Sequence, residues 1–168
     1  MGLVCVYSVA VLESASGRVA SRLRGFDASI MVTRGERLDA FAGTYDLFLV
    51  VSADVFCAPP PRTLRCRALL VPGGGQVDTV LQIPSQWVVS FGLSGKDSIT
   101  VSSLEPDYAV LALQRELVTL DGRVVEQQEI PLPIPRATGA SGLMALYGAL
   151  LLLGASPETL GASNAYIV

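Results

Sequence analysis

The residues best placed to do chemistry follow the first apolar segment of the chain, in the range Ser14–Val19. This range lies between an expected strand and an expected helix, where free backbone N–H groups and the helix dipole favour an anion. A phosphate loop that binds ATP continues after its last glycine with a lysine and then a serine or threonine, which contact phosphate and Mg²⁺. Here an arginine and a valine follow the glycine. The pattern therefore predicts either an anion site made by Ser14, Ser16, Gly17 and Arg18 or an ordinary serine-capped helix start, and it disfavours ATP hydrolysis.

Two further turns contain glycines and follow later apolar runs. Gly73, Gly74 and Gly75 end one run, and their backbone N–H groups are available to a ligand. Ser94 and Lys96 follow another, and Lys96 is the sole lysine of the chain. Because ligands of open α/β sheets bind at the carboxyl ends of strands, these five residues are also ligand-binding candidates. The alternative, which the residue types favour for both segments, is a plain turn.

The composition excludes much of the usual enzyme chemistry, because the chain contains no histidine. Histidine is the commonest general base and a frequent metal ligand, so triads that depend on it are absent. The cysteines Cys5, Cys57 and Cys66 lack the paired spacing of a disulfide framework or a zinc site, and we interpret them as reduced, largely buried thiols. We therefore predict no catalytic residue, no metal site and no cofactor. These features favour a protein that is not an enzyme.

Charge and hydropathy bear on the partners. The net charge is −3, and the five arginines between Arg18 and Arg37 are typical of a solvated helix face, so we expect no nucleic-acid partner. The longest apolar run, Leu143–Leu153, is too short to cross a bilayer and predicts a buried helix. The first residues include no basic side chain ahead of the apolar stretch, unlike a secretory signal. We expect a cytoplasmic protein without a membrane span.

Apolar runs bounded by turn residues predict the strands that position these candidates. Continuous runs are typical of parallel strands covered on both faces. In the first half of the chain we expect strands at Leu3–Val11, Ala28–Thr33, Tyr45–Ser52, Cys66–Val71 and Trp87–Phe91. We expect a helix from the first turn to about Leu23 and short helices at Gly35–Ala42 and Gln76–Gln82. Three consecutive prolines make Ala58–Arg65 a loop.

The pattern changes in the second half of the chain. Ser98–Ser103 alternates in polarity, and Tyr108–Thr119 and Arg123–Ile130 flank an Asp-Gly turn, which together predict an antiparallel meander. Ala140–Leu153 then predicts an apolar helix, and Ser156 precedes a proline in the manner of a helix cap.

We therefore predict an α/β fold with three layers, built on a mainly parallel sheet with an antiparallel meander extension near the C-terminal half. Residues 1–168 form a single domain in this prediction. A possible subdivision separates a parallel α/β part, residues 1–86, from a part with one strand, the meander and the last helices, residues 87–168.

Several of these segments together resemble a shortened central domain of the Mur ligase family. In that family a strand leads into a Gly-Thr-Asn-Gly-Lys-Thr phosphate loop, and Ser14–Val19 stands in the matching place with only the second glycine kept. Tyr45–Val51 is similar to the strand that precedes an acidic metal ligand, but Ser52–Asp54 follows here and the glutamate is absent. Val88–Gly92 resembles a strand-then-glycine element. Gly139–Gly142 stands where the family has a glycine-His-Asn loop, without the histidine or the asparagine.

The resemblance implies a domain that no longer ligates, because the family's phosphate lysine, magnesium-binding hydroxyl, metal-binding histidine and carbamylated lysine have no counterparts. We expect a non-catalytic, Mur-ligase-like binding or interaction module whose partner is an unknown protein or a second copy, bound through a sheet edge or an apolar surface. Two alternatives stay open. One is a small enzyme or sensor that acts on an anionic phosphate or carboxylate ligand through Arg18, Asp54, Lys96 and the Gly73–Gly75 loop, without histidine or metal. The other is a subunit or fragment of a larger assembly.

Overall fold

The computed structural model describes residues 6–52, 58–75, 77–133 and 139–162. Within these ranges the strands are β1 (Tyr7–Leu12), β2 (Ile30–Gly35), β3 (Thr44–Val50), β4 (Arg65–Pro72), β5 (Trp87–Phe91), β6 (Ile99–Leu104), β7 (Tyr108–Leu113), β8 (Leu117–Val118), β9 (Val124–Val125) and β10 (Gln128–Pro133). The helices are α1 (Val19–Phe26), α2 (Ala140–Leu152) and α3 (Pro157–Ala162), with 3₁₀ turns η1 (Leu38–Ala40) and η2 (Val80–Gln82). The predicted start of the first strand, Cys5, Asp54, Cys57 and Gln76 lie outside the described residues.

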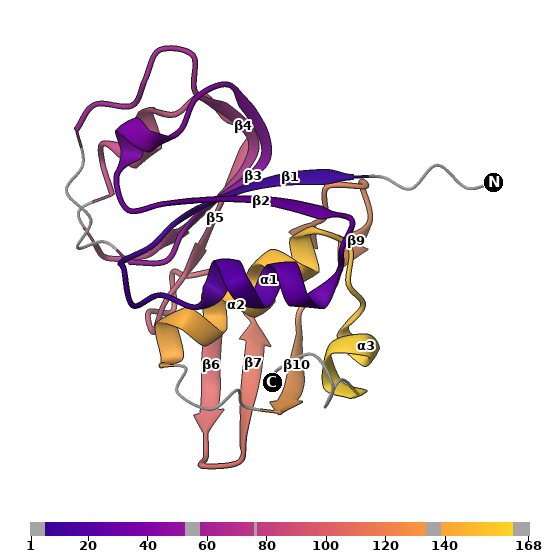
Figure 1. The fold of residues 1–168 in the computed structure, drawn as a ribbon. Helices are drawn as coiled ribbons and strands as arrows, with labels where there is room; N and C mark the ends of the chain where they lie inside the picture. The colour runs from indigo at the N-terminus through magenta and orange to yellow at the C-terminus, as the bar shows by residue number, and fades with distance from the viewer. Residues whose placement is uncertain (1–5, 53–57, 76, 134–138, 163–168) are drawn as a thin grey trace.

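Eight strands form one mixed sheet in the order β10-β7-β6-β5-β4-β3-β1-β2, and β8 and β9 form a separate antiparallel pair. The five strands from β2 to β5 in this order are all parallel. β6 is parallel to β5 but pairs with it only where Phe91 faces Ile99, and β7 and β10 continue the sheet in antiparallel fashion. Figure 1 shows these last three large strands reaching away from the parallel part. The predicted α/β class, with a mainly parallel sheet and an antiparallel extension, is confirmed.

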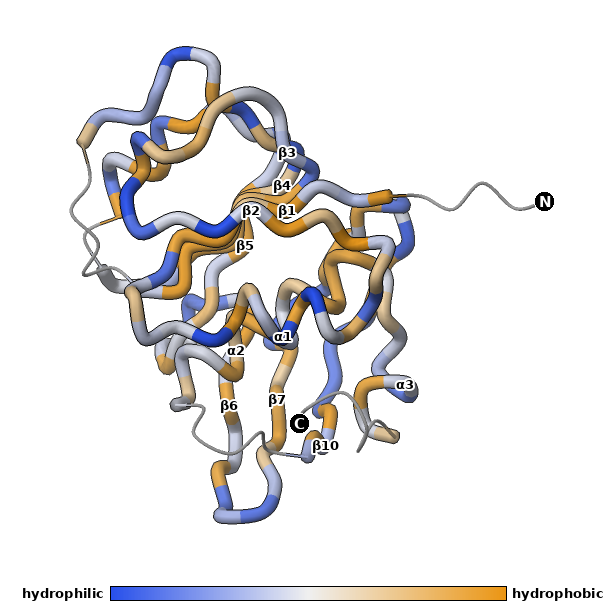
Figure 2. Tube along the Cα trace, in the orientation of Figure 1, coloured by the Kyte–Doolittle hydropathy of each residue, from blue (hydrophilic) through white to orange (hydrophobic). Residues whose placement is uncertain are grey.

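The parallel strands are apolar on both faces, which explains their continuous hydrophobic sequences. Val9 and Val11 of β1 point into a core beneath α1 and α2, whereas Ala10 and Leu12 point into a second core on the other face. In Figure 2 the tube is mostly orange, and so hydrophobic, where the parallel strands lie. The two faces differ in their cover. Helices α1 and α2 cover one face, and η1, η2 and the segments around them cover the other (Figure 1). The short helices predicted at Gly35–Ala42 and Gln76–Gln82 are each reduced to a single 3₁₀ turn, η1 and η2.

Helix α2 is buried on all sides, as its apolar sequence predicts. It packs so close to the sheet that a Cβ built on Gly148 would lie 2.8 Å from Ile99 Cδ1 and 3.2 Å from Leu70 Cδ2. The adjacent Tyr147 is 2% exposed and donates a hydrogen bond from its hydroxyl to the carbonyl oxygen of Pro133 at 3.1 Å. This helix contacts β3, β4, β5 and β6, and it therefore joins the parallel and antiparallel parts of the sheet. Among the described residues, none of the helices is long and apolar enough to span a membrane.

Two segments of the meander differ from the prediction. The strand expected over Tyr108–Thr119 is divided into β7, which ends at Leu113, and the short β8. Between them, the side-chain amide of Gln114 donates to the carbonyls of Ser94 and Asp97, both at 3.0 Å. The strand expected over Arg123–Ile130 is divided into β9 and β10, and β10 continues past Ile130 through Pro131 to Pro133. Proline is tolerated there because β10 pairs only with β7, and among the described residues no strand lies on its outer side to need an N–H group from it.

Both edges of the large sheet carry features that oppose pairing with another strand. On β10, Pro131 and Pro133 supply no N–H group. On β2, the guanidinium of Arg24 donates to the carbonyl of Val32 at 3.2 Å and so occupies one of the edge acceptors. The edges are therefore poor templates for strand addition.

Candidate functional site

The nine candidate residues predicted from the sequence lie in loops at the carboxyl ends of three parallel strands. Ser14, Ser16, Gly17 and Arg18 follow β1, the glycines at 73–75 follow β4, and Ser94 and Lys96 follow β5. The order β5-β4-β3-β1 places the first and last of these loops three strand spacings apart, about 14 Å. The loops after β4 and β5 are neighbours, since the Gly73 N–H donates to the Phe91 carbonyl at 2.8 Å. The candidates thus form two groups and not one cluster.

In the first group, the centre of the loop is occupied by a residue that the sequence analysis did not select. Glu13 directly follows β1 and is 1% exposed. Its Oε2 accepts the backbone N–H of Val19 at 3.0 Å, and its Oε1 accepts that of Ala20 at 3.3 Å. These are the first two N–H groups of α1, which would otherwise lack partners within the helix. The chain's own carboxylate therefore takes the place where the loop pattern predicts an external anion.

Arg34 completes this internal arrangement. Its Nε lies 3.1 Å from Glu13 Oε1, and its guanidinium also donates to the carbonyl of Ser14. Gly17 is required by the same packing, because a Cβ at that position would overlap the Glu13 carboxylate. Arg18 is exposed and donates to the carbonyl of Gly17 at 3.2 Å. The loop is thus built around a buried carboxylate that pairs with a partly exposed arginine.

The second group is built around another buried acid, Asp97, which is 4% exposed. Its Oδ2 accepts the N–H of Ser94 at 3.1 Å. A Cβ on either Gly73 or Gly92 would overlap its carboxylate, so the loops after β4 and β5 close around this one side chain. Lys96 lies at the exposed tip, where its backbone N–H donates to the Ser94 hydroxyl at 3.2 Å. The glycines at both loops leave room for Asp97.

Sequence reasoning missed Glu13 and Asp97 because burial of a carboxylate depends on partners that come from elsewhere in the chain. The one local signal is that each acid stands within five residues of a loop glycine that its side chain contacts. Glu13 lies four residues before Gly17, and Asp97 lies five residues after Gly92. Among the described residues, no group of three or more acids, cysteines or histidines is arranged to hold a metal ion. Cys66 is buried, and burial raises the pKa of its thiol to about 11, which keeps it in the unreactive protonated form.

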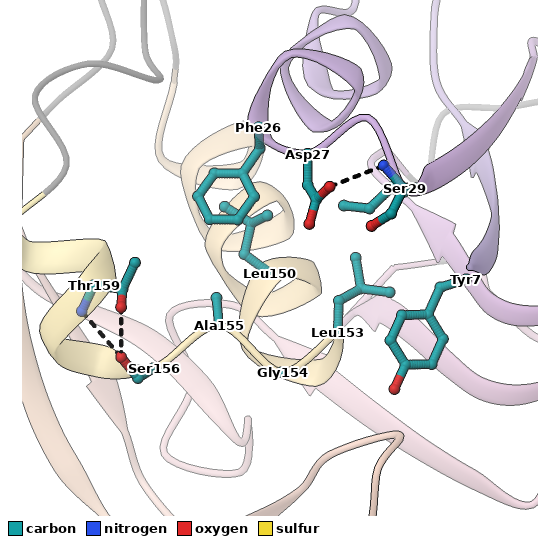
Figure 3. A pocket seen from close by; sticks show the side chains of 11 residues that line it. Tyr7, Phe26, Asp27, Ser29, Leu150, Leu153, Gly154, Ala155, Ser156 and Thr159 are labelled. Carbon is teal, nitrogen blue, oxygen red and sulfur yellow. Dashed lines mark hydrogen bonds between the residues drawn. The ribbon is translucent and has the colours of Figure 1, made fainter. Parts of the chain in front are cut away.

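A cavity of about 340 Å³ opens at the other end of the strands, beside the amino ends of β1 and β2, and we call it the amino-end cavity. Tyr7 and Ile30, the first residues of β1 and β2, line it together with the ends of α1 and α2 and the start of α3 (Figure 3). None of the nine candidate residues lines it. Its walls combine apolar side chains, such as Leu150 and Leu153, with hydroxyl groups and the carboxylate of Asp27.

Asp27 ends α1 and forms a local turn at the cavity wall. Its Oδ1 accepts the backbone N–H of Ser29 at 2.8 Å. Hydrogen bonds from the backbone and then the side chain of Ser29 hold the pKa of this carboxyl below its usual range, so it is ionised at neutral pH. Across the cavity, Ser156 caps α3 by accepting the N–H of Thr159 at 3.1 Å, as its place before Pro157 predicts.

Comparison with solved structures places this architecture among known folds. The chain is similar to the crystal structure of MurF, a Mur ligase, from Acinetobacter baumannii, with a TM-score of 0.54 and 10% sequence identity. The match covers 95% of this chain and 46% of the MurF chain, so this chain spans about half the length of that protein. No protein-family model matches the sequence. No curated protein matches it either. The structural match shows that nearly the whole chain shares its fold with part of a Mur ligase.

Proposed function

We propose that this chain is a non-catalytic binding or interaction module with a Mur-ligase-like fold that lacks the ATP and metal machinery of a ligase. The observation that carries this proposal is the position of the Glu13 carboxylate on the N–H groups of Val19 and Ala20. A strand-to-helix loop binds a nucleotide phosphate through N–H groups of this kind. In this chain those donors already have an acceptor.

The charge of Glu13 adds to this effect. A phosphate that approached the start of α1 would meet a negative charge whose counterion, Arg34, is already paired 3.1 Å away. Arg34 offsets part of this negative charge, but its hydrogen bonds go to Glu13 and Ser14 and not to a ligand. No lysine or metal-binding hydroxyl follows Gly17 to assist a phosphate. Binding of ATP at this loop is therefore unfavourable.

The expected protein partner, or a second copy of the chain, would use an apolar surface and not a sheet edge. Arg24 on one edge and the prolines of β10 on the other oppose strand addition. A partly apolar surface lies beside β5, where Val88 and Val118 are 48% and 46% exposed and flank a cavity of about 410 Å³. The lining of this cavity also includes Ser98, Arg115 and Glu116. Such a surface also suits the alternative that the chain is part of a larger assembly.

A second candidate function is recognition of an anionic ligand at the loops after β4 and β5. The observation in its favour is that the glycine loop at 73–75 and Lys96 lie on adjacent strands, which places backbone donors and the only lysine in the same region. Against it, Asp97 fills the centre of these loops with a negative charge.

The proposal is tested by thermal unfolding with ATP, ADP and UDP-sugars, each with and without Mg²⁺. A ligand at about 100 times its Kd adds about 2.7 kcal/mol of stability, which is a shift of roughly 5 to 10 °C for a chain of this size. We expect no shift and no release of phosphate from ATP. A shift that Arg18→Ala removes would overturn the proposal, because the first loop would then hold phosphate. A shift that Lys96→Ala removes, with Arg18→Ala as the matched control, would select the second candidate.

A further inference from the structure

The amino-end cavity has the electrostatic character of a cation site. Its lining contains the Asp27 carboxylate and no lysine or arginine. Helices α1 and α2 both direct their carboxyl ends toward it, since Phe26 ends α1 and Leu153 directly follows α2. The carboxyl end of a helix carries a partial negative charge. The end of α2 is offset by Arg123, whose guanidinium donates to the carbonyl of Gly154 at 2.8 Å. Asp27 and the carboxyl end of α1 therefore supply the negative potential of the cavity.

The Asp27 carboxylate is exposed and is oriented by Ser29. The Ser29 N–H donates to its Oδ1 at 2.8 Å, and the Ser29 side chain also hydrogen-bonds to this carboxyl group. Figure 3 shows the other oxygen directed into the cavity, between Leu150 and Leu153. A carboxylate that is oriented in advance in this way loses little freedom when it accepts a further hydrogen bond.

The remaining walls suit a group that carries a charge at one end and hydrocarbon behind it. Leu150 and Leu153 form an apolar surface below Asp27, with the ring of Phe26 on one side and that of Tyr7 on the other (Figure 3). Aromatic faces attract organic cations as well as hydrocarbon. A single carboxylate among apolar walls supplies too few oxygen ligands for Ca²⁺ or Mg²⁺, whereas one ammonium group needs only a few acceptors.

We propose that the amino-end cavity binds a small organic ammonium ion with a short alkyl chain, its N–H groups on Asp27 and its chain against Leu150 and Leu153. The volume of about 340 Å³ is within the range of small-molecule sites. This inference deepens the proposed function and rests on it, since the ligand is bound and not transformed. The cavity lies at the amino ends of the strands and shares no residue with the loops tested with nucleotides, so failure of this inference can be distinguished from failure of the proposed function.

The test is a titration of the full chain followed by amide chemical shifts in NMR, with n-pentylamine as the probe. Pentanol and pentanoate, which have the same chain with a neutral and a negative end, are the controls. We expect saturable shifts at Ser29 and at residues 153–156 with the amine alone. Asp27→Asn keeps an acceptor for the Ser29 N–H but removes the charge. It should lower the affinity for n-pentylamine about tenfold or more, as expected for loss of a charged hydrogen-bond acceptor.

Asp107→Asn is the matched control, because Asp107 is an exposed carboxylate in the turn between β6 and β7 and does not line the cavity. It should leave the affinity unchanged. Equal binding of pentanol and pentylamine, shifts confined to other parts of the molecule, or an unchanged affinity in Asp27→Asn would each overturn the proposal. Thermal unfolding of Asp27→Asn without ligand shows whether the variant is folded.

Discussion

The carboxylate of Glu13 occupies the space in which a side chain at position 17 would begin, so that any Cβ on Gly17 would overlap Glu13 Oε2. The glycine that makes this loop resemble a phosphate loop therefore has a different physical reason to be there. It makes room for an internal anion, where the glycines of a phosphate loop make room for a bound one. The same residue type at the same place in the fold thus serves opposite purposes.

Gly17→Ala should destabilise the protein by about 1–3 kcal/mol, because the added methyl group must displace a buried carboxylate from the start of α1. Gly25→Ala is the matched control. Gly25 lies within α1, and no atom is within 4 Å of its Cβ position. Alanine there should be neutral or should stabilise the protein by up to about 1 kcal/mol. Urea unfolding of both variants measures the difference. Equal effects would show that Glu13 moves aside at no cost.

Gly73→Ala should be destabilising for a related reason on the other loop, since its Cβ would overlap the carboxylate of Asp97. The loss, about 1–3 kcal/mol, should shrink when Asp97 is replaced by alanine, because the small side chain leaves room for the methyl group. A double-mutant cycle on these two positions measures the coupling. Additive effects would mean that the two loops do not close around Asp97 in solution.

The stability should fall at alkaline pH because two buried groups resist ionisation. Burial raises the pKa of Tyr147 from 10.0 to about 12 and that of Cys66 from 9.0 to about 11. A group whose pKa is raised in the folded state contributes its stability below the unfolded pKa and loses it as the pH rises through the folded pKa. The free energy of unfolding should therefore begin to drop near pH 9 and decline further up to pH 12, with Tyr147 accounting for about 2–3 kcal/mol.

Tyr147→Phe separates the two contributions. It should cost about 1 kcal/mol at neutral pH through loss of the hydrogen bond to Pro133, and it should flatten the decline above pH 10. Tyr108→Phe, at an exposed position, should leave the pH profile unchanged. The measurement is urea unfolding across the alkaline range. An unchanged slope in Tyr147→Phe would contradict the burial of a protonated phenol.

Ser156→Ala should weaken α3 by about 1 kcal/mol, because the Thr159 N–H loses its acceptor at the start of the helix. Ser156→Asp supplies another acceptor and should restore most of this stability. Hydrogen exchange of the amides in α3 is the suitable measurement, since a local change of this size is resolved there even when global unfolding is little affected. Equal exchange rates in the alanine and aspartate variants would argue against the cap.

The sequence was sufficient for the parts of the fold that depend on local pattern. The strand predicted at Trp87–Phe91 has those bounds in the structure, and α2 and the cap at Ser156 lie where the apolar run and the Ser-Pro pair predict them. The bounds of the meander were wrong at Gln114 and at the prolines of β10. In both cases the deciding interaction is nonlocal: Gln114 bonds to the loop around Asp97, and β10 tolerates proline because of its place in the sheet order.

The candidate sites were harder to predict for a similar reason. The loops at Ser14–Arg18 and 73–75 were located correctly at strand ends, but the acids that fill them were not recognised. Glu13 is buried because Arg34, from another strand, pairs with it, and no spacing rule connects the two residues. The amino-end cavity unites residues from the two ends of the chain, Tyr7 and Thr159 among them, and only the folded structure brings these together.

The position of α2 along the chain has a consequence for biosynthesis. Every strand of the eight-stranded sheet precedes α2 in the sequence, yet α2 is the helix that seals one face of that sheet and joins its two parts. A polypeptide emerges from the ribosome amino end first. All eight strands are therefore made while the apolar face beneath α2 still lacks its cover. Until α2 follows, that apolar face is the part of the new chain most open to self-association, while Arg24, Pro131 and Pro133 oppose pairing only at the sheet edges.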